Sequence, residues 1–412
     1  MASRENRSVT PDRETTWEAR PSRDSSPARG ASTSHGTEVS ALVSGRLGPG
    51  NVIVLDGGLG THLETRGADV TGALWSAQIL RDAPEEVRAA HRDFFEAGAQ
   101  AAITCSYQVS ADGLLAAGLA GSRAEAEREC ERLLRLSVDV AAQAARDVGR
   151  VDADAAPSRS QTGAAPSTEA GNGALTAGGS ERTPFASDAA VDRGCDVPGA
   201  SVDRGLDVTG AAVARQPIVA ASIGPYGAGP GEGTEYDGSY GLGARQLAAW
   251  HRPRIEVLAA SGADVLLAET IPSIVEVEAL ADELARTGRP WMLSVTAAQA
   301  GLRDGTSLGD VVRALDGAEG LVALGVNCCA PDQALAAVRC LAEAGAAPLM
   351  AYPNSGETWD RRARAWRPAP SGTPESITGL VPDFLDAGVR LIGGCCRVGP
   401  GEIGEIARAV RA

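Results

Sequence analysis

Four of the eight cysteines in the chain form two adjacent pairs, Cys328–Cys329 and Cys395–Cys396. Clustered cysteines in a chain of this length favour a metal or catalytic site over a disulfide framework. Thiolates are soft ligands, and they select Zn²⁺ among the common cytosolic metals. Two alternatives are buried structural thiols, because free cysteine is often buried, and a redox-active disulfide.

The local sequence around each pair suggests how many thiols reach a metal. Side chains alternate in direction along an extended strand, so Cys328 and Cys329 are expected to supply one ligand between them. Gly393 and Gly394 precede the second pair and would let the backbone bend so that both thiols face the metal. Three thiolates and one open position are typical of a catalytic zinc site. Such a zinc ionises an incoming thiol and leaves its sulfur nucleophilic, which suits attack on an alkyl donor.

The elements that must position these cysteines form a regular alternation along the chain. Apolar, β-branched runs predict strands at 52–55, 101–104, 218–221, 265–268, 291–295, 321–326, 348–351 and 389–392. Helical spacing follows each run, near 84–97, 122–148, 244–261, 273–287, 307–316, 331–344, 374–387 and 401–411. Continuous apolar strands between amphipathic helices indicate a parallel sheet covered on its outer face. This pattern predicts an α/β fold of the (β/α)₈ TIM-barrel type.

Two segments do not fit the alternation. Residues 1–48 are polar and poor in aliphatic side chains, and we expect a disordered N-terminal extension. Residues 151–215 are rich in Ala, Gly, Ser, Thr, Asp and Pro, which predicts a disordered, low-complexity insertion. The barrel is then expected to occupy 49–412 with this interruption. Because the insertion joins the second helix to the third strand, it is predicted to lie on the N-terminal face, away from the chemistry.

Polar residues collect where the predicted strands end, which is the face of a (β/α)₈ barrel that carries chemistry. Asp56 ends the first strand and Glu269 ends the fourth. Their carboxylates would suit an ammonium group on the thiol substrate, or they could cap the helices that follow. Tyr107, Tyr226 and Tyr352 also lie at strand ends, where an aromatic face could attract a cationic donor or simply pack.

The overall charge excludes several classes of partner. The formal net charge is -15, with no basic stripe, so nucleic acid and anionic membranes are not expected as main partners. No apolar run approaches the roughly 20 residues of a membrane span. Residues 1–36 contain no apolar stretch typical of a secretory signal, so we expect a cytoplasmic protein that acts on small molecules.

The motifs taken together resemble the homocysteine S-methyltransferase family, the zinc-dependent homocysteine-binding barrels. The matching segments are 55–61, 104–108, 222–228, 251–254, 269–272, 325–328, 352–357 and 393–396. Their order and spacing are highly specific, and the resemblance covers nearly all of 51–149 and 216–412. The segments 106–108, 224–228 and 251–254 are most similar to the branch that uses S-methylmethionine or S-adenosylmethionine.

The resemblance implies roles for individual residues. Cys328, Cys395 and Cys396 would bind zinc, Asp56 and Glu269 would lie near the homocysteine amino group, and Cys329 would have no ligand role. The implied activity is methyl transfer from a sulfonium donor to the thiol of homocysteine, which gives methionine and belongs to methionine biosynthesis.

Three questions stay open at this stage. The alternative functions are a methyltransferase that uses another donor, such as betaine, and a non-catalytic zinc- or thiol-binding regulatory barrel. The loop at 227–236 is glycine-rich where relatives carry bulkier residues, which leaves the donor preference open. The oligomeric state does not follow from the sequence.

Overall fold

The computed structural model describes residues 45–46, 50–69, 74–155, 216–229, 235–236, 238–298, 301–346, 348–360, 365–367 and 376–412. Most of the predicted extension at 1–48 and of the predicted insertion at 151–215 lies outside these residues. Residues 151–155 are described, and they form the end of helix α6, Arg123–Ala155. This helix therefore runs further than the predicted 122–148, because alanines at 153 and 155 continue to favour a helix.

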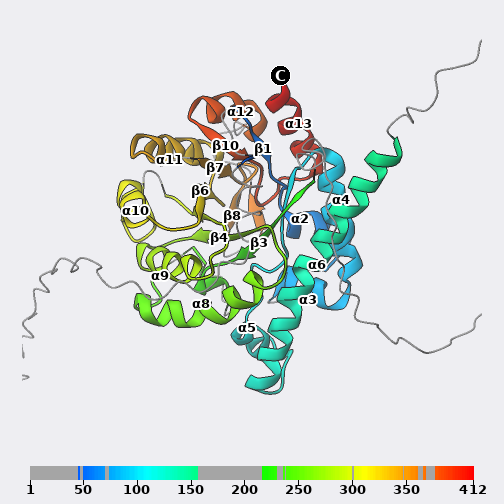
Figure 1. The fold of residues 1–412 in the computed structure, drawn as a ribbon, viewed down its shortest axis with the longest axis vertical. Helices are drawn as coiled ribbons and strands as arrows, with labels where there is room; N and C mark the ends of the chain where they lie inside the picture. Colours follow the sequence, from blue (N-terminus) through cyan, green and yellow to red (C-terminus); the bar gives the residue numbers. More distant parts are fainter. Residues whose placement is uncertain are drawn as a thin grey trace, which may run out of the picture.

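Eight parallel strands form the centre of the molecule (Figure 1). The strands are β1 Ile53–Val54, β2 Ala101–Ile103, β3 Ile218–Ile223, β4 Val265–Ile271, β5 Trp291–Val295, β6 Leu321–Asn327, β7 Leu349–Tyr352 and β10 Val389–Ile392. Their order in the sheet is β1-β10-β7-β6-β5-β4-β3-β2. A parallel bridge between Leu55 and Ala101 joins the two outer strands and closes the sheet into a barrel. The predicted (β/α)₈ architecture is confirmed.

Helices surround the strands. They are α2 Leu59–Thr65, α3 Trp75–Asp82, α4 Pro84–Ala97, α5 Ala111–Ala116, α6, α8 Ala244–Ala259, α9 Ile274–Ala285, α10 Leu308–Ala314, α11 Pro331–Glu343, α12 Ile377–Asp386 and α13 Pro400–Arg411, with a 3₁₀ turn η1 at Tyr226–Ala228. The sequence pattern did not predict α2, α3 and α5, which have six to eight residues, although it located the equally short α10 at 307–316. It also missed a small hairpin of β8 Thr358–Asp360 and β9 Ala365–Arg367.

The alternation of side chains along each strand divides the core into two layers. Ile53 and Leu55 point into the barrel and pack with Leu267, Met292 and other inward residues. Val54, between them, belongs to the larger apolar layer that lies between the strands and the helices. This division is the one expected for strands that are buried on both faces.

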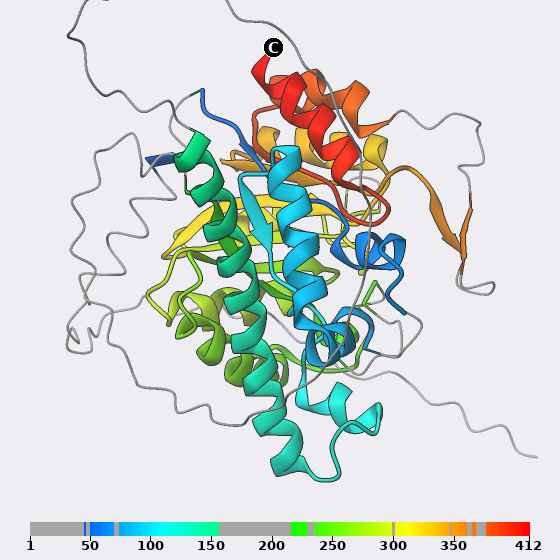
Figure 2. The same cartoon turned by 90° about the vertical axis from the view of Figure 1, so that its right-hand side faces the viewer.

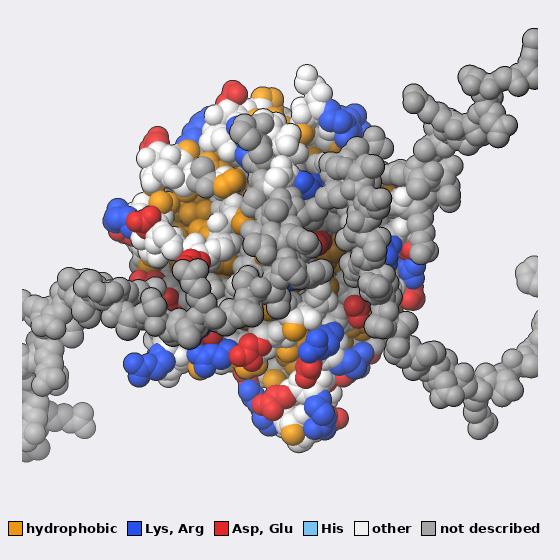
Figure 3. Space-filling view, viewed as in Figure 1, with side chains coloured by type: hydrophobic (Ala, Val, Ile, Leu, Met, Phe, Trp, Pro, Cys, Tyr) orange, Lys and Arg blue, Asp and Glu red, His pale blue; other side chains and the backbone are white. Residues whose placement is uncertain are grey.

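The loops at the two ends of the barrel differ. The helix α2 and the hairpin β8–β9 lie on one side, beyond the carboxyl ends of the strands, while α6 runs alongside α4 and ends on the other side (Figure 2). Acidic and arginine side chains are interspersed among the described residues on the face drawn in Figure 3. No described helix combines the length and apolarity needed to cross a membrane.

Candidate functional site

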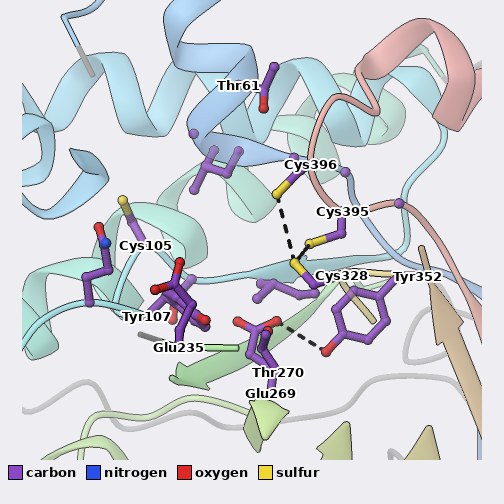
Figure 4. Close-up of a pocket in the computed structure, with 18 of the residues that line it drawn as sticks. Thr61, Cys105, Tyr107, Glu235, Glu269, Thr270, Cys328, Tyr352, Cys395 and Cys396 are labelled. Carbon is purple, nitrogen blue, oxygen red and sulfur yellow. Dashed lines mark hydrogen bonds between the residues drawn. The ribbon is translucent and has the colours of Figure 1, made fainter. Parts of the chain in front are cut away.

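A pocket opens at the carboxyl ends of the strands, where the polar motifs meet (Figure 4). The residues that line it end or follow every barrel strand except β5. They are Gly57, Gly58, Leu59, Gly60, Thr61, Ile103, Thr104, Cys105, Tyr107, Gln108, Glu235, Tyr236, Glu269, Thr270, Cys328, Tyr352, Gly394, Cys395 and Cys396. The barrel topology therefore gathers side chains that are far apart in the sequence into one site.

Three thiols converge in this pocket. The sulfur of Cys328 lies 2.7 Å from that of Cys395 and 3.9 Å from that of Cys396. All three sulfurs lie within 4.8 Å of one another, and all three cysteines are free. A disulfide bond would be about 2.05 Å long, so the closest contact is a crowded thiol–thiol contact and not a covalent link.

This cluster is suited to a metal cation. Two thiolates on one tetrahedral zinc lie about 3.8 Å apart when each bond is about 2.3 Å. The contact between Cys328 and Cys396 already matches this separation, and the one between Cys328 and Cys395 would have to widen by about 1.1 Å. Hydrogen bonds from the thiols of Cys395 and Cys396 also hold the pKa of Cys328 well below its usual range. The cluster therefore favours a thiolate at its centre. Three sulfur donors of this kind fit a soft divalent metal.

Backbone geometry turns Cys328 into the pocket. Its φ is 53°, in the left-handed region that non-glycine residues rarely adopt. The adjacent Cys329 is buried in the apolar layer between strands and helices, where burial raises its pKa to about 12. Only the first thiol of this pair lines the pocket. The left-handed turn at Cys328 separates the two side chains, whereas the sequence suggested the alternation of an extended strand.

A second residue of the pocket wall, Thr270 on β4, also has a strained backbone, and the last residue of β6, Asn327, holds it in place. Thr270 has a φ of 62°, which is a conformational outlier for a β-branched side chain. The buried side chain of Asn327 fixes it from two directions: its Oδ1 accepts from the Thr270 backbone N–H at 2.9 Å, and its Nδ2 donates to Thr270 Oγ1 at 2.7 Å. Ser294 Oγ donates to the same Oδ1 at 2.7 Å. Strain that the surroundings hold this firmly is common at functional sites.

Glu269 lies in the pocket wall with its carboxylate oriented by two hydroxyls. Ser222 Oγ donates to its Oε1, and Tyr352 Oη donates to its Oε2 at 3.2 Å. Burial raises the pKa of Glu269 to about 7, because the charged form loses its water. A cation placed beside this carboxylate would replace the stabilisation that water gives to the charged form, and would therefore favour the ionised carboxylate.

Asp56 lies behind the lining rather than in it. It is 1% exposed, and its Oδ2 accepts from the backbone N–H of Ile103 at 2.9 Å. Nδ1 of the buried His91 lies 3.9 Å from the same oxygen, and Oδ1 has no hydrogen-bond partner within the described residues. Burial raises the pKa of Asp56 well above its usual value. The structure thus places Asp56 next to the site but one layer deeper than Glu269.

The three tyrosines that the sequence places at strand ends do not all reach the pocket. Tyr107 and Tyr352 line the pocket, whereas Tyr226 packs against Tyr240 and Trp250 outside it, with ring centres 5.1 and 5.0 Å away. Sequence reasoning assigned no role to Thr270, Glu235 or Tyr236. Glu235 and Tyr236 belong to the glycine-rich loop at 227–236. The only sequence feature that pointed to this loop was its departure from the family pattern.

Comparisons with known proteins agree with one another. A family model described as homocysteine S-methyltransferase matches residues 53–410. Homocysteine S-methyltransferase YbgG of Bacillus subtilis is 33% identical over 363 residues, which cover 88% of this chain and 95% of that protein. Homocysteine S-methyltransferase of Escherichia coli is 33% identical over 358 residues, which cover 86% of this chain and 94% of that protein.

Solved structures give the same result. The crystal structure of the homocysteine methyltransferase MmuM from Escherichia coli in its metallated form aligns with a TM-score of 0.64 at 32% identity. The alignment covers 88% of this chain and 96% of that chain.

Proposed function

The chain belongs to the homocysteine S-methyltransferase family, and from this premise we propose that it transfers a methyl group from a sulfonium donor to homocysteine. The donor would be S-methylmethionine or S-adenosylmethionine, and the product methionine. The observation that carries the proposal is the convergence of three thiols in a pocket whose wall also holds Glu269.

The residues present fit a zinc ion. Cys328, Cys395 and Cys396 would hold it, since they offer three sulfur donors within 4.8 Å of one another and stabilise a thiolate. When bound in such a site, zinc lowers the pKa of a substrate thiol and keeps it as a nucleophilic thiolate at neutral pH. No general base is then required among the side chains of the pocket.

The carboxylates would recognise the amino group of homocysteine. Glu269 lines the pocket together with the three cysteines, and Ser222 and Tyr352 fix the direction of its oxygens. Asp56, which accepts a hydrogen bond from the backbone N–H of Ile103 one layer deeper, would lie near the same ammonium. An ammonium that contacts Glu269 would orient homocysteine with its sulfur directed at the three thiols.

The remaining task of the pocket is to align the two substrates. Transfer of a methyl group between two sulfur atoms develops no oxyanion, so no oxyanion hole is needed. Holding the nucleophile and the methyl carbon roughly 3–3.5 Å apart and in line can supply much of the acceleration. Tyr107 and Tyr352 present aromatic rings in the pocket, and such rings attract a sulfonium cation.

We also propose a cytoplasmic location and a role in methionine biosynthesis. The seven described cysteines are all free, and thiols that bind a metal must stay reduced, as the cytosol ensures.

Incubation of the purified, zinc-loaded protein with homocysteine and one donor at a time tests the proposal. S-methylmethionine or S-adenosylmethionine should yield methionine, and betaine should yield none. Methionine formed from betaine alone would reassign the donor. Retained zinc without turnover on any of the three donors would favour the non-catalytic, regulatory barrel.

A further inference from the structure

Glu235 brings a second carboxylate into the pocket from a different direction. It belongs to the loop after β3, is half-buried, and lines the pocket together with Tyr236. In Figure 4 Glu235 lies beside Tyr107, while Glu269 and Tyr352 lie together at another part of the wall. Besides burial, the negative charge of Glu235 raises the pKa of Tyr107, and both residues line the pocket that holds the three thiols.

The charges of the substrates indicate what this carboxylate does. Homocysteine brings one ammonium and one carboxylate, for which Glu269 is the proposed partner. A sulfonium amino-acid donor brings an ammonium, a sulfonium and one carboxylate, and it therefore carries a net positive charge. Among the described lining residues there are two carboxylates, Glu235 and Glu269, and neither Arg nor Lys. The pocket is thus built for two cationic groups, and the acceptor accounts for one of them.

We propose that Glu235 recognises the positive charge of the methyl donor and makes the pocket selective for a cationic donor over a neutral one. This inference rests on the proposed function, because it assigns the donor side of the same site. In this assignment Glu269 binds the ammonium of the methyl acceptor, homocysteine, and Glu235 binds the cationic methyl donor.

The direction of the kinetic effect follows from the charge changes in the reaction. As the thiolate sulfur forms its bond to the methyl carbon, the old carbon–sulfur bond breaks and its electron pair stays on the donor sulfur. The donor loses its sulfonium charge and becomes a neutral thioether. A nearby carboxylate therefore stabilises the bound donor at least as much as the transition state, and weakly holds the product. Loss of Glu235 should raise the KM for the donor without lowering kcat.

Steady-state kinetics of Glu235→Gln test this assignment. With homocysteine saturating, the KM for S-methylmethionine should rise about 10- to 100-fold, the range expected for loss of a charge-assisted hydrogen bond. The KM for homocysteine should change by less than about 3-fold. Glu269→Gln should show the opposite pattern. Glu64→Gln is the matched control, because it removes one negative charge from an exposed position on α2 and should change neither KM.

A binding measurement separates this inference from the proposed function. Calorimetric titration of the zinc-loaded protein should show tighter binding of S-methylmethionine than of methionine, and Glu235→Gln should abolish the preference. Glu235→Asp, which keeps the charge, should retain part of it. An unchanged donor KM together with an unchanged preference would overturn the assignment of Glu235. Absence of methyl transfer by the wild-type protein would overturn the proposed function, and the titration would still decide the role of Glu235.

Discussion

The two cysteine pairs of this protein have the same sequence, but their side chains lie in different surroundings. At 328–329 only the first thiol lines the pocket, and the second is 6% exposed within the apolar layer. At 395–396 both thiols line the pocket. The first pair follows a regular strand, β6, whereas the second follows two glycines after β10. Cysteine side chains alone therefore do not decide which thiols can bind a metal.

The difference lies in how closely the backbone packs. A Cβ at Gly394 would lie 2.1 Å from Cγ1 of Val398, and one at Gly393 would lie 2.6 Å from Cβ of Leu55. The glycines let the chain after β10 pass close against its neighbours, and this path turns both thiols toward Cys328. At the first pair, the left-handed conformation of Cys328 directs its thiol into the pocket, and Cys329 enters the apolar layer.

Serine substitutions at the three clustered cysteines should have the largest effect. Cys328→Ser, Cys395→Ser and Cys396→Ser should each lose most of the bound zinc and at least about 100-fold in activity, because a hydroxyl is a harder and far less acidic ligand than a thiol. Metal analysis of the purified variants measures this directly. Full zinc content in any one of them would remove that residue from the ligand set.

Gly394→Ala should break the geometry of the second pair without touching a thiol. The added methyl collides with Val398, and overpacking of this kind costs typically about 1–3 kcal/mol of stability. Zinc affinity should fall as the loop moves, as competition with a chelator would show. Gly401→Ala, on α13 with open space around its Cα, is the matched control and should be neutral or stabilising. Normal zinc affinity in a folded Gly394→Ala would contradict the packing explanation.

Asn327→Ala should weaken the first pair indirectly. It removes both hydrogen bonds that hold Thr270 at positive φ, next to Cys328 in the pocket wall. Loss of such supporting contacts typically lowers metal affinity about 10-fold or more, and thermal stability should fall as well. Ser294→Ala removes only the hydroxyl behind Asn327 and should have a clearly smaller effect on zinc. Equal zinc affinities in both variants would show that the Thr270 conformation does not matter for the metal.

Cys329→Ser should have the smallest effect on the site. The substitution places a hydroxyl in the apolar layer, so we expect a loss of stability of about 1–2 kcal/mol. Zinc content and methyl transfer should remain at wild-type levels, because Cys329 faces away from the pocket. Thermal melting and metal analysis together test both parts. A Cys329→Ser protein without zinc would show that the two pairs are equivalent after all.

Much of the barrel could be read from the sequence, because each βα unit carries its own local signal. Continuous apolar runs and amphipathic spacing located all eight barrel strands and one helix after each of them. The short helices α2, α3 and α5 and the hairpin β8–β9 could not be found in this way. A segment of six to eight residues gives only a weak periodic signal, and contacts with the rest of the barrel help to decide its conformation.

The sequence by itself determined which residues end each strand, and in a parallel barrel this places Asp56, Glu269 and the cysteines at one rim. Only the tertiary structure decided how deep each side chain lies. In the structure Glu269 lines the pocket, whereas Asp56 lies one layer deeper and accepts a hydrogen bond from the backbone of Ile103. A side chain near a strand end can face either the pocket or the layer that supports it. The tertiary structure also brought Glu235 to the pocket from a loop without periodicity. Long-range packing, and not local sequence, sets the path of such a loop.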